Sequence, residues 1–189
     1  MPGIPAPARD GNRIRQWLVD RGADRIDHPG GTLLDHLGRV AHRLDDWAVP
    51  DDVVLAGLCH AAYGTDGFAT ALITPDERHR LVDLVGERAE HLVYLYGSCV
   101  RNPLYPQLSG HDQVTVLDRF TGDAHRLDDA DLRAFLEITV ANEIDVMVHN
   151  EALARQHAQP LFELFSSAGH RLSEAARRDC AILTGLALG

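Results

Sequence analysis

Two histidines, His36 and His60, lie where the side chains of two successive helices are expected to meet. His36 stands one helical turn from apolar residues on either side, so it shares the buried stripe of its helix. His60 follows Ala56 and Gly57 by one turn, and these small residues leave room beside its ring. A single histidine on a buried stripe is usually a hydrogen-bonded core residue, but two converging imidazoles suit a divalent transition metal. The pair therefore predicts a metal site between the two helices.

Helices are the elements expected to position these histidines. Thr32 can cap the helix that carries His36, with Asp35 at its third position, and apolar residues then recur at helical spacing. Later, Thr74 is followed by proline and, three residues on, by glutamate, a typical helix start. The expected helices cover residues 10–22, 32–44, 51–62, 74–86 and 87–96, a long helix from Asp128 through Ile144, and two final segments broken near Pro160 and Gly169.

Residues 114–127 interrupt this helical pattern. They alternate apolar and polar residues around a Thr-Gly-Asp turn, as a small β-hairpin does, and residues 98–112 before them read as irregular. The sequence therefore predicts an all-α fold with a small β-hairpin insertion. We expect residues 1–9 to form a flexible N-terminal leader and residues 10–189 to form one helical domain.

The composition excludes several classes of function. The formal net charge is −10, and no run of basic residues is long enough to follow a phosphate backbone, so nucleic acid is not an expected partner. No apolar window approaches the roughly 20 residues of a membrane helix. The N-terminus lacks the pattern of a signal peptide, and the three widely spaced cysteines suit buried thiols in a reducing cytoplasm. A cytoplasmic protein with a small-molecule substrate is expected, and the sequence leaves open whether it forms homo-oligomers.

The stretch from His28-Pro through His36 and the segment Val54-Leu-Ala-Gly-Leu-Cys-His60 resemble the HD superfamily, and most closely the hydrolase domains of alarmone enzymes. The likeness covers roughly residues 25–150, with Ile138-Thr-Val-Ala-Asn142 similar to the last metal-binding helix of that superfamily. The segment His60-x-x-Tyr-Gly-Thr is also similar to an HD-like family of unknown function. The resemblance implies an HD-like helical domain with a metal centre.

The chain departs from the HD pattern at its acidic positions. The resemblance implies one His, a His-Asp doublet and a distant Asp as ligands, but the residue after His60 is Ala61, and the distant position falls on Asn142. Asp145, three residues later on the same helical face, could substitute for it. The predicted metal residues are therefore His36, His60, Asn142 and Asp145. The Glu-Asp pair that alarmone hydrolases use falls on Gly64 and Thr65, so alarmone hydrolysis is not expected.

Four further residues are candidates for catalytic roles. His28 precedes a Pro-Gly-Gly turn and either reaches over the pocket mouth or is an ordinary loop histidine. Tyr63 and Thr65 offer hydroxyls beside His60 for orienting a substrate or a water, or they simply end the helix. Glu90 either pairs with an arginine at the surface or enters the pocket as a base.

These residues support three hypotheses for the function. The first is a small-molecule enzyme of hydrolase ancestry with a degenerate, mononuclear HD-type site. The second is an iron-dependent oxygenase, because two histidines and Asp145 would form a 2-His-1-carboxylate set that favours Fe(II) or Mn(II). The third is a metal-free pseudoenzyme or ligand-binding module, in which the neutral Asn142 amide leaves the site without a cation and a histidine could act as a general base.

Overall fold

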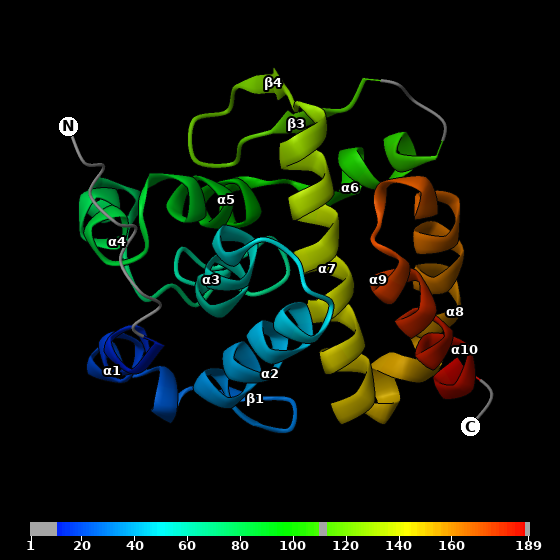
Figure 1. Cartoon of the computed structure of the whole chain (residues 1–189), viewed down its shortest axis with the longest axis horizontal. Helices are drawn as coiled ribbons and strands as arrows, with labels where there is room; N and C mark the ends of the chain where they lie inside the picture. The colour runs from blue at the N-terminus through cyan, green and yellow to red at the C-terminus, as the bar shows by residue number, and fades with distance from the viewer. Residues whose placement is uncertain (1–10, 110–112, 188–189) are drawn as a thin grey trace.

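A long central helix, α7 (Asp129–His149), organises the computed structural model, which describes residues 11–109 and 113–187. In Figure 1, α2 (Leu33–Asp46), α3 (Asp51–Cys59) and α5 (Glu87–Ser98) lie on one side of α7, and α8 (Glu151–Ser167) lies on the other. Most of α7 is buried because it packs against all four of these helices. The expected leader, residues 1–9, lies outside the described residues.

The remaining elements are short. On the α2 side they precede or connect the packed helices, and after α8 the chain returns along α8 and α7, where α9 lies between these two helices in Figure 1. They are α1 (Gly11–Asp20), η1 (Ala23–Arg25), η2 (Pro75–Glu77), α4 (Arg78–Val85), α6 (Arg101–Leu104), η3 (Tyr105–Leu108), η4 (Gly169–Arg171), α9 (Glu174–Asp179) and α10 (Ala181–Ala187).

Side-chain caps fix where the main helices begin. The Thr32 hydroxyl accepts a hydrogen bond from the Asp35 N–H, and the Asp35 carboxylate accepts one from the Thr32 N–H, as predicted for the start of α2. Asp128 caps α7 in the predicted position by accepting from the Asp131 N–H. Asn150 then ends α7 and caps α8, so the chain reverses direction within one residue.

The predicted hairpin is present, and a second one precedes α2. Strands β3 (Thr115–Leu117) and β4 (Ala124–Arg126) pair antiparallel, with Val116 opposite His125. Strands β1 (Asp27–His28) and β2 (Gly31–Thr32) form the second, very short hairpin, which the sequence did not indicate. The all-α fold with a small β-hairpin insertion is confirmed.

Two local expectations were wrong. Pro160 does not interrupt the helix at this position, because α8 continues through it from Glu151 to Ser167. One missing hydrogen bond is tolerated there since α8 packs against both α7 and α10. The segment expected to be irregular contains α6 and η3, which carry Arg101 and Tyr105.

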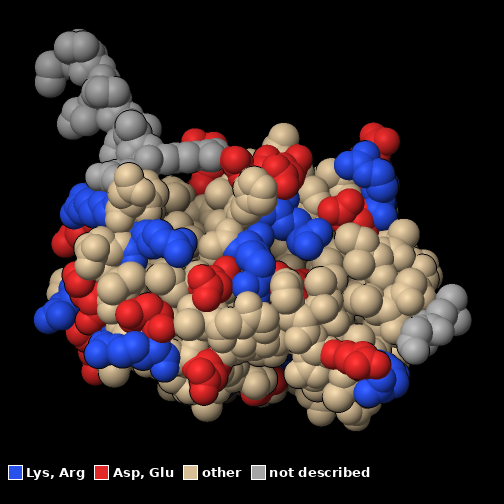
Figure 2. Space-filling view, turned by 90° about the horizontal axis from the view of Figure 1, so that it is seen from below, with Lys and Arg blue, Asp and Glu red and all other residues tan. Residues whose placement is uncertain are grey.

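No helix within residues 11–109 and 113–187 is both long and apolar enough to cross a membrane. The face shown in Figure 2 carries acidic and basic side chains interspersed with one another.

Helices α2 and α3 approach closely because Gly57 has no side chain. A Cβ at Gly57 would lie 2.2 Å from Leu44 Cδ1 and 3.6 Å from Val40 Cγ1, and both of these residues are fully buried. Gly57 lies one turn before His60, so this approach sets the separation between His60 and the helix that carries His36.

Gly57→Ala should therefore lower the free energy of unfolding by about 1–3 kcal/mol through overpacking. This cost outweighs the roughly 1 kcal/mol that alanine gains over glycine in a helix. Urea unfolding followed by circular dichroism measures the change. Gly185→Ala in α10 is the matched control: its Cβ would meet open space, so it should be neutral or slightly stabilising. A Gly57→Ala protein as stable as the wild type would contradict the close-approach argument.

Candidate functional site

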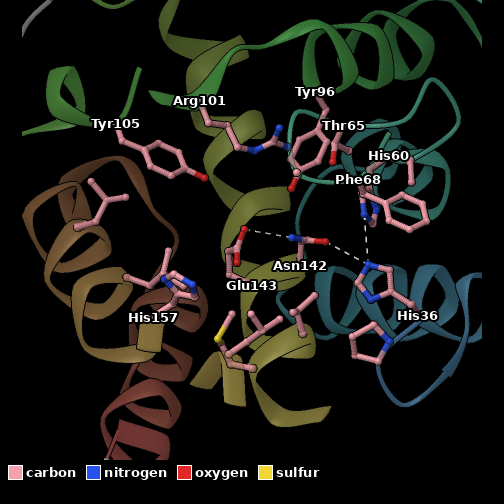
Figure 3. A pocket seen from close by; sticks show the side chains of 18 of the residues that line it. His36, His60, Thr65, Phe68, Tyr96, Arg101, Tyr105, Asn142, Glu143 and His157 are labelled. Atoms are coloured by element: carbon pink, nitrogen blue, oxygen red, sulfur yellow. Dashed lines mark hydrogen bonds between the residues drawn. The ribbon is translucent and has the colours of Figure 1, made fainter. Parts of the chain in front are cut away.

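The candidate site is a cavity of about 800 Å³ between α7 and the elements on both sides of it. Figure 3 shows His36 and His60 on one side, Arg101 and Tyr105 on the other, and Asn142 between them. The α7–α8 part of the wall is mainly apolar; its residues include Val146, Met147, Leu153, Leu161 and Leu164. The cavity thus joins a polar corner to an apolar chamber, as small-molecule sites do.

His36 is held in one orientation by Asp145. The ring is 1% exposed, and its Nδ1 lies 2.7 Å from Asp145 Oδ2. Because an ionised carboxylate only accepts hydrogen bonds, Nδ1 of His36 carries the proton. The other ring nitrogen, Nε2, points into the site, and it has a lone pair when the ring is neutral.

Asp145 is a buried carboxylate with two partners. Arg39 donates to it from Nε (2.7 Å, to Oδ1) and from Nη2 (2.9 Å, to Oδ2). Burial alone would raise the pKa of Asp145, but the hydrogen bonds from His36 and Arg39 outweigh it and lower the pKa to about 2. Both oxygens of Asp145 therefore accept hydrogen bonds, Oδ1 from Arg39 and Oδ2 from both His36 Nδ1 and Arg39. Its predicted role as a metal ligand is wrong in this geometry, and it acts instead as the partner that orients His36.

His60 presents the second ring nitrogen. Its Nδ1 lies 2.7 Å from the Gly57 carbonyl oxygen, which can only accept, so Nδ1 carries the proton. Burial lowers the pKa of His60 to about 3, so the ring is neutral at neutral pH. Its unprotonated Nε2 lies 3.3 Å from Nε2 of His36.

Asn142 on α7 supplies a third acceptor. Its Nδ2 donates to Glu143 Oε1 at 3.3 Å, which turns Oδ1 toward His36 Nε2 at 3.1 Å. The dashed lines in Figure 3 trace this chain from Glu143 through Asn142 to the histidines. Burial raises the pKa of Glu143, although Arg101 and the Asn142 amide oppose the rise. Three acceptor atoms thus converge: two imidazole nitrogens and one amide oxygen.

These atoms fit a small cation. Donor atoms about 2.0–2.2 Å from a divalent ion are separated from one another by about 3.0–3.4 Å, and the observed separations are 3.1 and 3.3 Å. Over residues 11–109 and 113–187, no group of three or more His, Cys, Asp or Glu side chains is arranged to hold a metal. The candidate ligand set is therefore His36, His60 and the neutral Asn142, with Asp145 behind His36.

His28 covers this ligand set. Its ring stacks on that of His36, with the centroids 4.0 Å apart, and lines the cavity. Arg39 donates to the carbonyl oxygens of Pro29 and Gly30, which ties the β1–β2 turn to the buried carboxylate of Asp145. Burial lowers the pKa of His28 to about 4, and its buried Nδ1 has no hydrogen-bond partner. Of the two readings of His28, the structure supports the one that places it at the pocket.

Of the other three candidates for catalytic roles, one lines the cavity and two do not. Thr65 lines the cavity, as expected. Tyr63 and Glu90 do not line the cavity, and of the two readings of Glu90 the structure supports the one that pairs it with an arginine. The buried Tyr63 hydroxyl donates to Glu90 Oε1 at 2.7 Å, and Arg78 holds both oxygens of Glu90 at 2.8 and 2.7 Å. Tyr63, Glu90 and Arg78 therefore tie the chain after α3 to α4 and α5.

Sequence reasoning missed several polar residues of the cavity. Arg101, Tyr105, Glu143 and His157 all line it. Glu143 follows Asn142 directly, which is a weak signal that could have been used. The other three come from segments far from His36 and His60 in sequence. Only the tertiary packing of α6, η3 and α8 brings them to the site.

Comparison with known proteins gives one match. Residues 17–101, somewhat less than half of the chain, match the sequence model of a family described as a domain of unknown function (DUF6817). The matched region includes both histidines of the ligand set but ends before α7. Searches of the curated proteins and of the solved structures found no match.

Asp145→Asn should lower the free energy of unfolding by about 2 kcal/mol near neutral pH, because the ionised form is stabilised in the folded protein. The folded pKa is depressed below the ordinary value near 4, so this contribution is complete above that value. It is lost as the pH falls toward 2. The difference between wild type and variant in urea unfolding should therefore shrink over this window.

Glu151→Gln is a suitable control, because Glu151 forms an exposed pair with Arg155. It should change stability by at most about 0.5 kcal/mol at any pH. A wild type–Asp145→Asn difference that stays constant from neutral to acid pH would disprove the assigned ionisation.

Proposed function

We propose that this chain is a metal-dependent enzyme acting on a small molecule, with a degenerate, mononuclear site of the HD type and hydrolysis as its reaction class. The observation that carries the proposal is that His36 Nε2 lies 3.3 Å from His60 Nε2 and 3.1 Å from Asn142 Oδ1. The Nδ1 atoms of both histidines already donate hydrogen bonds elsewhere.

A positive centre is needed among these atoms. Three lone pairs that face one another at hydrogen-bond distance repel unless a proton or a cation lies between them. Carboxylate–histidine pairing such as that of Asp145 and His36 is the usual support of a metal ligand, since it fixes the tautomer and raises the basicity of the ring. The hydrogen bond from His60 to the Gly57 carbonyl does the same for the second ring.

The types of ligand atom indicate which metal ion the site would bind and which reaction that ion would support. Two imidazoles and an amide oxygen suit divalent transition metals better than Mg(II). We propose Fe(II) or Mn(II), as expected from the sequence. The 2-His-1-carboxylate set that would favour an oxygenase is incomplete, because the carboxylate of Asp145 faces the Nδ1 edge of His36 and the guanidinium of Arg39.

When bound, a divalent ion at this site would supply Lewis acidity toward a substrate carbonyl and lower the pKa of a water molecule. His28 is positioned to move a proton, because its unpartnered Nδ1 lies in a neutral ring beside His36. Thr65 offers a hydroxyl at the same cavity wall. The apolar chamber excludes water from the rest of the substrate.

The direct test is metal content. Wild-type protein loaded anaerobically with Fe(II) or Mn(II) and then desalted should retain about one ion per chain. His36→Ala and His60→Ala should lose it, because each removes a nitrogen ligand. Tyr63→Phe is the matched control: it removes a buried hydroxyl near His60 in sequence but outside the cavity. It should keep the ion.

The outcomes separate the hypotheses. No ion in loaded wild type would overturn the proposal and favour a metal-free ligand-binding module. Retention of the ion in both histidine variants would overturn the assigned ligands. Oxygen consumption by the Fe(II) protein with a substrate would favour the oxygenase over the hydrolase.

Asn142→Asp should tighten metal binding by about tenfold or more, because a carboxylate offsets the charge of the ion and a neutral amide does not. The gain should appear as a higher midpoint of thermal unfolding in the presence of Mn(II), since binding to the folded state stabilises it by mass action. Asn102→Asp, at an exposed position of the cavity rim, is the control for added charge alone. An Asn142→Asp protein that binds Mn(II) no better than Asn102→Asp would disprove Asn142 as a ligand.

A further inference from the structure

The cavity contains buried polar atoms that the protein itself does not satisfy. His28 Nδ1, Tyr96 Oη and Arg101 Nη1 all belong to residues that line it, and none of the three has a hydrogen-bond partner. Burying a polar atom without a partner costs free energy, so such atoms are rare unless a ligand or water completes them. Their concentration around one cavity indicates a ligand with polar groups.

Arg101 is the charged member of this group. Its guanidinium lies over the ring of Tyr96, with Cζ 4.6 Å from the centroid, which holds the planar group in place. Among the described residues, no carboxylate forms an ion pair with it. Figure 3 shows the Arg101 guanidinium next to Tyr96 and above Asn142. A guanidinium with free donors on a rigid platform is suited to a planar anion.

Tyr96 also connects Arg101 with the histidines. Its ring meets that of His60 edge-on, with the centroids 5.2 Å apart, and Arg101 covers the same ring. The ring of Tyr96 therefore separates an anionic group bound at Arg101 from the nitrogen atoms of His60 and His36. A small molecule can reach both.

The rest of the cavity limits the ligand further. The chamber formed by Val146, Met147 and the leucines of α8 calls for an apolar body. The carboxylate of Asp27 also lines the cavity, so it repels a ligand with two negative charges more than a ligand with one. This disfavours a phosphate dianion relative to a carboxylate.

We infer that the substrate is a small, mainly apolar molecule with a single carboxylate, which Arg101 binds while the apolar body rests against α7 and α8. The inference names the substrate class of the proposed enzyme and rests on that proposal for the reaction. The binding itself requires only Arg101 and the chamber.

The test uses three probes with the same apolar body: phenylbutyrate, phenylbutanol and phenylbutyl phosphate. Isothermal titration calorimetry on the metal-free wild type, in chelator, should show phenylbutyrate binding about ten- to a hundredfold more tightly than phenylbutanol, the range of a charge-assisted hydrogen bond. The phosphate should bind more weakly than phenylbutyrate. This comparison of probes requires no variant, so it does not depend on how a substitution affects folding.

Variants then locate the carboxylate. Arg101→Gln should remove the preference for the acid over the alcohol, and Arg101→Lys should keep part of it, because the charge remains without the planar fork. Arg155→Gln, at an exposed arginine of α8, is the matched control and should bind as the wild type does. Circular dichroism checks that each variant is folded.

The same experiment distinguishes this inference from the proposed function. Phenylbutyrate should bind the metal-free protein in chelator as tightly as it binds the Mn(II)-loaded protein. Binding that requires the metal and His36 but tolerates Arg101→Gln would place the carboxylate on the ion, overturning the inference and leaving the metal site standing. Arg101-dependent binding to a protein that retains no metal would support the inference and overturn the enzyme proposal. No binding of phenylbutyrate, or equal binding of the acid and the alcohol, would disprove the inference.

Discussion

The buried carboxylate of Asp145 is the constraint on which the site depends. A charge this deeply buried is stable only when paired, and here His36 and Arg39, both on α2, hydrogen-bond to it from across the α2–α7 interface. This pairing fixes the tautomer and the direction of His36. Arg39 also connects Asp145 to the β1–β2 turn, because it donates hydrogen bonds to the carbonyl oxygens of Pro29 and Gly30. His28 is held over His36 as a result, so one carboxylate orients two of the cavity's histidines.

The central helix α7 contributes both to the polar corner of the cavity and to its apolar chamber. Asp145 and Asn142 of α7 turn toward α2, while Val146 and Met147 of the same helix face the chamber covered by α8. Residues three or four positions apart share a helical face, and neighbouring residues point to different faces. A single buried helix can therefore position polar groups next to an apolar chamber without a loop. This arrangement favours substrates with a reactive polar end and an apolar body.

The sequence was most informative where local rules decide the structure. The capping boxes, the apolar stripe of α2 and the turn of the β3–β4 hairpin act within a few residues, and each element was predicted close to its observed position. His36 and His60 were predicted to converge because both stand on buried faces of neighbouring helices. The sequence could not decide between the two readings of Tyr63 and of Glu90, since the direction of their side chains depends on partners such as Arg78 that sequence proximity does not reveal. Arg101, Tyr105 and His157 reach the cavity only through packing between distant segments.

Ala61 and Asn142 stand where the HD pattern has aspartates, so the proposed ligand set contains no carboxylate and would leave more positive charge on a bound ion. A carboxylate ligand would offset much of the charge of a bound ion, and a neutral amide offsets little. A protein with this set would bind its ion less tightly, but the ion would present more of its positive charge to a substrate. A proton in place of the ion would satisfy the same three acceptors, yet it would leave no open coordination position for chemistry. The supporting pairs of His36 with Asp145 and His60 with Gly57 hold both rings so that their Nε2 atoms lie 3.3 Å apart. Together with Arg101 beyond Tyr96, a bound ion would give the cavity two positive points separated by one aromatic ring. A substrate with one carboxylate and one further polar group would complement both.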